Sequence, residues 1–134
     1  MAQRNSRPAI FLDANILFSA AYGSPAVKRL QEKAKSNECS LLASEYVIEE
    51  ARRNLDTKEQ ITALKNVLSQ VRVVREAAPE ISCPISLPSK DRPVFMAAMM
   101  AQADYLVTGD LIHFGPYFGK TIQGVTICQL KDLK

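Results

Sequence analysis

The sequence predicts an α/β protein in which a parallel β-sheet is covered on both faces by helices, because strand-like and helical segments alternate along the chain. Two apolar, strand-like runs, residues 8–12 and 105–107, stand out because each leads to an aspartate. Asp13 follows the first run directly, and Asp110 follows the second after a Thr-Gly pair. Gly109 is expected to give the backbone the freedom that this turn needs. Parallel strands end at one edge of a sheet, where ligands bind, so the two acids are expected to share a site.

The length and composition are those of one ordinary folded domain, residues 1–134. Hydrophobic residues make up 47% of the chain and charged residues 23%, which is enough apolar material for a core. No apolar run approaches the roughly 20 residues of a membrane helix, so no membrane association is expected. Three cysteines without metal-ligand spacing indicate reduced thiols in a cytoplasmic protein. The net charge of +3 permits a nucleic-acid partner without requiring one.

Strands and helices are expected to alternate along the chain, apart from one long loop. β-favouring runs predict strands at residues 8–12, 39–43, 71–74, 105–107 and 125–127. Apolar periodicity and capping residues predict a helix or turn at residues 14–22 and helices after Ser24, Ser44, Thr57 and Asp91. Residues 76–90 contain three prolines and exceed a usual connection, which favours a functional or a mobile loop.

Four carboxylates are expected near the carboxyl edge of the sheet. Asp13 and Asp110 end strands, Glu50 follows the second strand on the buried side of its helix, and Asp91 begins the helix that leads to residues 105–107. Four acids in one place repel one another unless cations are bound. Mg²⁺ and Mn²⁺ prefer oxygen ligands of this kind. Such ions activate a water molecule and stabilise the charge that develops on a phosphodiester.

Each acid taken alone has a simpler explanation. An acid after a strand is commonly a helix N-cap, and Asp91 could be one. Glu49 and Glu50 together could be a solvated helix surface, although helical phase turns Glu50 inward and Glu49 outward. The order and spacing of all four acids favour a site over four separate structural roles.

The four acids lie in four motifs that follow one another along the chain. These are residues 10–15 (hydrophobic-Asp-x-Asn), residues 44–50 (Ser-x5-Glu), Asp91 with Phe95 and Ala98, and residues 103–110 (Ala-Asp-x-hydrophobic-hydrophobic-Thr-x-Asp). Together they resemble the PIN domain family, in the branch of prokaryotic proteins often paired with small antitoxins. The resemblance extends from Ile10 to about Ile127, which is nearly the whole chain.

The resemblance implies a three-layer α/β/α sandwich with a central parallel sheet. It also implies a metal-dependent ribonuclease, the toxin of a toxin–antitoxin pair, with a small antitoxin as partner. In this comparison Asp13, Glu50, Asp91 and Asp110 are the catalytic acids that bind Mg²⁺ or Mn²⁺. The chain departs from the family where Leu-Ile-His-Phe follows Asp110, because a further acid sometimes found there is missing. Fewer or more weakly bound ions are expected for that reason.

Four neighbours of these acids are candidates for orienting them or for contacting substrate. Asn15 can hydrogen-bond an acid or a phosphate, and Thr108 can orient Asp110 through its hydroxyl group. Arg92 either holds a phosphate or belongs to a solvated basic face. His113, the single histidine, either contacts substrate or packs within its loop.

A homodimer is expected from the aromatic residues near the C-terminus. Phe114, Tyr117 and Phe118 exceed what a loop needs and are predicted to form an exposed apolar patch.

Other folds with an acid after the first strand fit less well. A haloacid-dehalogenase-type phosphatase needs a second aspartate two residues after the first, where this chain has Asn15. A response-regulator receiver needs an acidic pair before the phosphoacceptor, and residues 3–5 read Gln-Arg-Asn. The alternative that remains is a PIN-like fold that binds RNA or protein without cleavage. The intact acids argue against it, because a module without catalysis has no reason to hold repelling charges together.

Overall fold

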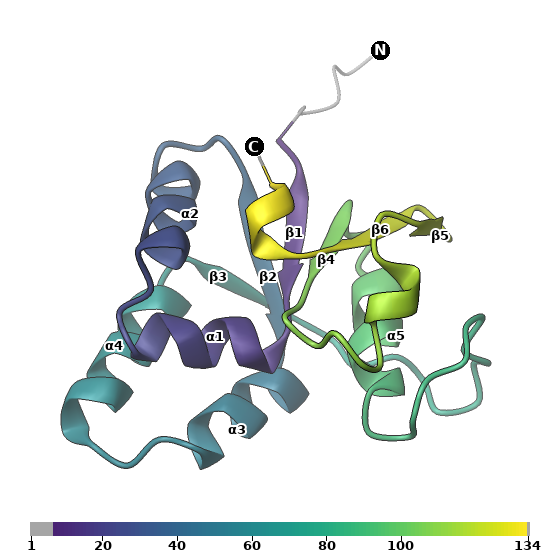
Figure 1. The fold of residues 1–134 in the computed structure, drawn as a ribbon, viewed down its shortest axis with the longest axis horizontal. Coiled ribbons are helices and arrows are strands. Elements are labelled where there is room, and N and C mark those ends of the chain that lie inside the picture. Colours follow the sequence, from purple (N-terminus) through teal and green to yellow (C-terminus); the bar gives the residue numbers. More distant parts are fainter. Residues whose placement is uncertain (1–6, 134) are drawn as a thin grey trace.

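The computed structural model describes residues 7–133, in which a six-stranded sheet is flanked by five α-helices (Figure 1). The sheet order is β3-β2-β1-β4-β6-β5, and every neighbouring pair is parallel except β5 with β6. The strands are β1 (Ala9–Leu12), β2 (Ser40–Ser44), β3 (Val71–Val74), β4 (Tyr105–Val107), β5 (Thr121–Ile122) and β6 (Val125–Cys128). The predicted α/β class is confirmed, with one antiparallel edge added to the parallel sheet.

Helices follow the strands closely. They are α1 (Ala14–Ala21), α2 (Pro25–Lys35), α3 (Glu45–Arg53), α4 (Lys58–Leu68) and α5 (Arg92–Met100), with 3₁₀ turns η1 (Gly115–Tyr117) and η2 (Leu130–Asp132). Helix α5 packs against β2 and β4, whereas α1 packs against α3 and α4. No helix in residues 7–133 is both long and apolar enough to cross a membrane.

The central strands explain why the acids meet. Phe11 of β1 pairs with Leu106 of β4, and both side chains are fully buried. The pairing continues one residue further, because the amide of Asp13 donates to the carbonyl oxygen of Val107 at 3.0 Å. The two strand ends therefore lie at the same level of the sheet, as the sequence predicts.

Strand β5 was not predicted because it is only two residues long, too short for a periodic pattern. It joins β6 through Gln123 and Gly124, whose φ angles of 52° and 83° are both positive. Two positive φ values are the mark of a tight two-residue hairpin turn.

The helix caps divide into those that the sequence predicts and one that it does not. Thr57 and Gln60 form the predicted capping box at the start of α4. Ser44 occupies the N-cap position of α3, but its buried hydroxyl group makes no capping hydrogen bond. Instead the amide of Tyr46 donates to the carboxylate of Glu76, at 3.0 Å. The capping residue, Glu76, is 30 positions away from Tyr46 in the chain, so the sequence around Ser44 could not reveal it.

Candidate metal centre

All four predicted acids line one pocket at the carboxyl edge of the sheet. Asp13 follows β1, Asp110 follows β4, Glu50 lies on α3, and Asp91 immediately precedes α5. The pocket has a volume of about 500 Å³, and Lys90 also lines it. The fold therefore brings these acids together, although they are separated by up to 97 positions in the chain.

Asp13 is held by protein donors on both of its carboxylate oxygens. Its side chain is almost fully buried, with 6% exposure for the residue. Oδ1 accepts a hydrogen bond from the amide of Ala14 at 2.7 Å, which caps α1. Oδ2 accepts from the hydroxyl of Thr108 at 2.8 Å and from the side-chain Nδ2 of Asn15 at 3.4 Å. The carboxylate orientation is consequently fixed before any ligand binds.

Thr108 and Asn15 connect the two strand ends. The hydroxyl oxygen of Thr108 accepts from the amide of Asp110 at 3.1 Å while its proton goes to Asp13. Thr108 therefore orients the carboxylate of Asp13 and only the backbone of Asp110. The side-chain oxygen of Asn15 accepts from the amide of Gly109 at 2.8 Å. The predicted conformational need for Gly109 is wrong, because its φ is not positive and a Cβ would make only an ordinary 3.5 Å contact with Asn15.

The environment of Asp13 raises its pKa to about 6. Burial is the main cause, because the charged form loses its hydration. The hydrogen bonds from Thr108 and Ala14 lower the pKa, and the nearby charges of Glu50 and Asp91 raise it further. The pocket thus destabilises an extra negative charge, which is the electrostatic condition under which a cation binds favourably.

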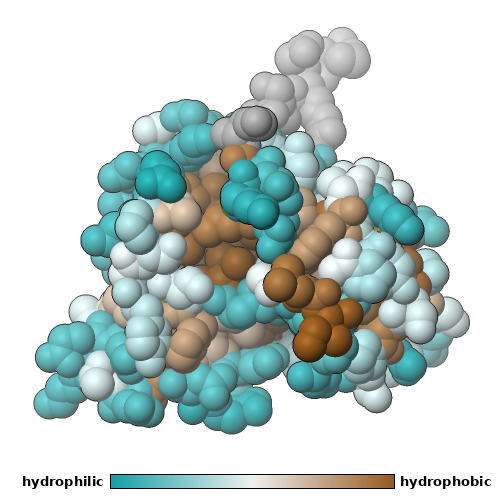
Figure 2. Space-filling view, viewed as in Figure 1, coloured by the Kyte–Doolittle hydropathy of each residue, from teal (hydrophilic) through white to brown (hydrophobic). Residues whose placement is uncertain are grey.

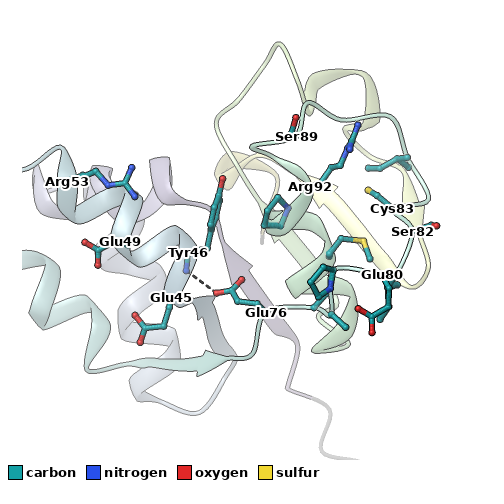
Figure 3. Close-up of a pocket in the computed structure, with 17 residues that line it drawn as sticks. Glu45, Tyr46, Glu49, Arg53, Glu76, Glu80, Ser82, Cys83, Ser89 and Arg92 are labelled. Carbon is teal, nitrogen blue, oxygen red and sulfur yellow. Dashed lines mark hydrogen bonds between the residues drawn. The ribbon is translucent and has the colours of Figure 1, made fainter.

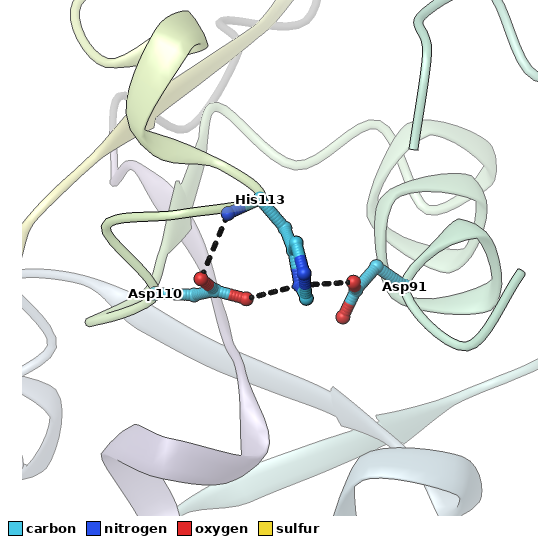
Figure 4. Close-up of side chains that lie close together, drawn as sticks. All are labelled: Asp91, Asp110 and His113. Carbon is cyan, nitrogen blue, oxygen red and sulfur yellow. Dashed lines mark hydrogen bonds and ion pairs between the residues drawn. The ribbon is translucent and has the colours of Figure 1, made fainter. Parts of the chain in front are cut away.

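Two acids of the pocket, Asp91 and Asp110, form a group with the adjoining His113 (Figure 4). The imidazole Nδ1 of His113 lies 2.8 Å from Oδ2 of Asp91 and 3.1 Å from Oδ2 of Asp110. The first distance is that of an ion pair, but the two atoms lack the alignment of a hydrogen bond. Oδ1 of Asp110 accepts from the amides of Ile112 and His113 at 3.0 and 2.9 Å. His113 therefore contacts two of the acids directly rather than packing within its loop.

Asp91 is at the N-cap position of α5 but does not cap it. Its carboxylate makes no hydrogen bond to the first turn of the helix. Pro93 stands in that turn and has no amide proton to donate. Burial raises the pKa of Asp91, opposed by the charge of His113 and reinforced by that of Asp110. The structural explanation of Asp91 as a helix cap is thereby excluded, and its carboxylate faces the pocket instead.

Glu50 enters the pocket because of its position on α3. It is half-buried, whereas Glu49 is exposed and pairs with Arg52 at 2.8 Å. Helical phase therefore predicted correctly that Glu50 is turned inward and Glu49 outward. Tyr46, one turn before Glu50, donates its hydroxyl proton to the carbonyl oxygen of Lys90 at 2.6 Å. This bond ties α3 to the residue before Asp91 across 44 positions, so no local pattern in the sequence could reveal it.

A comparison with known families decides what kind of protein carries this pocket. The PIN domain family matches residues 9–111, which include all four acids. The chain belongs to the PIN domain family. The resemblance drawn from the motifs is thereby confirmed, and the PIN-like fold with it.

The same fold occurs in a crystal structure described as VapBC2 from Rickettsia felis bound to a DNA fragment from their promoter. The TM-score is 0.64 with 16% sequence identity, and the alignment covers 90% of this chain and 98% of that chain. An identity of this size shows a shared fold alone. No curated protein matches the chain significantly in sequence.

This PIN domain also has a larger cavity, of about 970 Å³, between α3 and the segment that leads to α5 (Figure 3). Tyr46, Glu76 and Arg92 line it together with apolar residues such as Met96, and none of the four acids does. Arg92 donates to the carbonyl oxygen of Leu87 at 3.0 Å. The structure therefore places Arg92 in the neighbouring cavity and not in the acid pocket. The converging carboxylates, rather than size, identify the smaller pocket as the candidate site.

The predicted aromatic patch is wrong. Phe114 is fully buried in the core, and Tyr117 donates to the carbonyl oxygen of Ser86 while accepting from its amide. Tyr117 thus ties the long loop at Ser86 to η1, while Phe114 belongs to the core and Phe118 packs against it. The most exposed large apolar residues of the described chain are instead Leu111 and Ile112, at 65% and 81% exposure. Figure 2 shows a brown patch that protrudes beside the segment after β4.

Two acids of the pocket and the adjoining His113 fit a divalent cation. Oxygen atoms of Asp91 and Asp110 and the imidazole nitrogen of His113 all lie within 4.8 Å of one another. Oδ2 of Asp91 is buried and takes part in no aligned hydrogen bond with the described residues. Buried carboxylate oxygens of this kind are typical ligands of Mg²⁺ and Mn²⁺.

Proposed function

We propose that this PIN domain is a Mg²⁺- or Mn²⁺-dependent endoribonuclease and the toxin of a toxin–antitoxin pair. The observation that carries the proposal is the convergence of Asp13, Glu50, Asp91 and Asp110 on one pocket. Membership of the PIN domain family supports a nuclease that hydrolyses nucleic acid. The choice of RNA as the substrate and of these metals as cofactors goes further and is part of the proposal.

The four acids would hold the cation, which when bound supplies an activated water and neutralises charge on a phosphodiester. The protein's own contribution is positioning. Thr108 and Ala14 fix the carboxylate of Asp13, and the Tyr46–Lys90 bond fixes α3 beside Asp91. A site assembled in advance avoids reorganisation during the reaction.

Basic residues beside the pocket would bind the RNA backbone. Lys90 lines the acid pocket, and its positive charge acts on Asp91. Arg53 and Lys90 both line the hollow that adjoins the pocket at Glu50. Two cations at the margin of an acidic site attract phosphates without competing with the metal ligands. Arg92 is the weakest of the predicted substrate residues, because it lies outside the pocket.

A small antitoxin is the proposed protein partner. The structural neighbour is part of a VapBC toxin–antitoxin complex, which supports a partner of this class. The acidic pocket would accept an arginine or lysine of the antitoxin in place of the metal's charge. A cytoplasmic location and a homodimer complete the proposal, with the exposed Leu111 and Ile112 as the apolar surface.

One observation favours the alternative of a non-catalytic PIN domain that binds RNA or protein. His113 lies between Asp91 and Asp110 and can balance their charge without a metal. The acids could then persist without catalysis.

The test is an RNA-cleavage assay with single-stranded and structured RNAs in Mg²⁺, in Mn²⁺ and in excess chelator. The proposal predicts cleavage by the wild type with metal, none in chelator and none by Asp110→Asn. Expression in a bacterial host should slow growth for the wild type but not for that variant. Cleavage that persists in chelator would refute the metal mechanism. No cleavage under any condition, with RNA still bound, would establish the non-catalytic alternative.

A further inference from the structure

The imidazole of His113 lies against two of the four acids, Asp91 and Asp110. Its Nδ1 is buried and lies 2.8 Å from Oδ2 of Asp91 and 3.1 Å from Oδ2 of Asp110 (Figure 4). Neither Nδ1 nor Oδ2 of Asp91 takes part in an aligned hydrogen bond with the described residues. Three possible metal-ligand atoms, one nitrogen and two oxygens, therefore lie close together.

The backbone builds this position. Oδ1 of Asp110 accepts from the amide of His113 at 2.9 Å, which closes a turn and leaves Oδ2 toward the ring. The next residue, Phe114, is fully buried and anchors the end of the turn in the core. The ring is therefore presented to the two carboxylates by a fixed turn between strand and core.

The spacing of the three atoms suits one cation. Ligands at about 2.1 Å in an octahedral shell lie about 3.0 Å apart when adjacent. The distances from Nδ1 to the two carboxylate oxygens, 2.8 and 3.1 Å, are close to that value. All three atoms lie within 4.8 Å of one another, so one ion can contact all of them.

We propose that His113 is a metal ligand together with Asp91 and Asp110, and that its nitrogen makes the site select Mn²⁺ over Mg²⁺. Imidazole nitrogen suits first-row transition metals, whereas Mg²⁺ is bound by oxygen ligands and retained water. Selection of Mn²⁺ sharpens the proposed function, on whose divalent metal it rests.

The competing role for His113 is structural. A histidine that only separates two carboxylates would have to leave when metal binds. Its removal would then leave metal affinity unchanged or increase it. The two roles therefore predict opposite effects of one substitution.

The experiment is isothermal titration of Mn²⁺ and of Mg²⁺ into the wild type, His113→Gln and Met100→Gln. Glutamine retains polarity and approximate size at position 113. Met100 is exposed at the end of α5 and has no place in the site, so Met100→Gln is the control. We expect His113→Gln to weaken Mn²⁺ binding about tenfold or more and Mg²⁺ binding by less than about threefold. Met100→Gln should leave the binding of both metals unchanged. Unchanged or tighter Mn²⁺ binding, or equal losses for both metals, in His113→Gln would overturn the proposal.

A second readout does not depend on RNA cleavage. Co²⁺ bound to the wild type should give visible absorption bands whose position changes in His113→Gln, because a nitrogen ligand is replaced. Thermal unfolding followed by circular dichroism verifies that the variant is folded. These outcomes separate the two proposals. His-dependent Mn²⁺ selection without RNA cleavage supports the ligand role and refutes the nuclease. RNA cleavage with unselective metal binding supports the nuclease and refutes the proposed role of His113.

Discussion

Asp13 and Asp110 both end a central strand, yet the protein holds them in different ways. Asp13 is buried and receives hydrogen bonds from Ala14 on one oxygen and Thr108 on the other. Asp110 is more exposed, and its own turn supplies both donors to Oδ1. Its second oxygen lies 3.1 Å from Nδ1 of His113.

The difference shows that two parts of the fold position the two carboxylates of one pocket. The Asp13 side is fixed by contacts between adjacent strands, so its geometry is set by the sheet. The Asp110 side is set by the turn after the sheet and by His113, whose ring faces the second carboxylate oxygen of Asp110. The two sides of the pocket therefore depend on different parts of the fold, one on the sheet and the other on the turn that follows β4.

The largest effect is expected on catalysis, where the two aspartates should be equal. Asp13→Asn and Asp110→Asn should each reduce the rate of RNA cleavage by more than about a hundredfold, because each removes a charge that holds the metal. Asparagine at position 110 can still accept both backbone hydrogen bonds, so its melting temperature should be unchanged or raised. Measured rates and melting curves check both points. A sharply lower melting temperature for Asp110→Asn would show that this acid is structural.

A smaller effect is expected when Asp13 loses the hydrogen bond from Thr108. Thr108→Val should lower the free energy of unfolding by about 2 kcal/mol, because a buried carboxylate loses the hydroxyl that donates to it. Urea denaturation measures the loss. Thr108→Ser keeps the hydroxyl group and should restore most of the stability. Equal stability of the valine and serine variants would contradict a stabilising role for this hydrogen bond.

Acidification should stabilise the metal-free protein. The pKa of Asp13 is raised from 3.8 to about 6, so the folded state binds a proton in a range where the unfolded state does not. Unfolding stability should therefore increase by about 1 kcal/mol between pH 7 and pH 5, and continue to increase toward pH 4. The raised pKa of Asp91 acts in the same direction. Urea titrations at several pH values should show a smaller increase for Asp13→Asn, and equal slopes would contradict the assignment.

The smallest effect concerns the helix that carries Glu50. Glu76→Gln keeps the hydrogen-bond acceptor for Tyr46 but removes the negative charge at the N-terminus of α3. Stability should fall by about 0.5 kcal/mol in chemical denaturation. Glu80→Gln, in the same segment but without this contact, is the control and should have no effect.

Much of the site could be predicted because its positions depend on local patterns. The strand ends place Asp13 and Asp110, and helical phase separates Glu50 from Glu49. The contacts that complete the site join distant residues and leave no local pattern. Glu76 caps a helix 30 positions away, and the ring of His113 reaches Asp91 across 22 positions. Composition also misled at Phe114, because an aromatic residue in a glycine-rich segment reveals nothing about its burial.

The most direct test of the central claim is to locate a metal in the acid pocket. Crystals grown with Mn²⁺ should show anomalous difference density between Asp91, Asp110 and the Nδ1 atom of His113. The same crystals of Asp110→Asn should lose that density while the fold is retained. Density at this position would establish the pocket as the metal centre of the PIN domain. A pocket without density at saturating Mn²⁺, or density only elsewhere on the protein, would contradict the account.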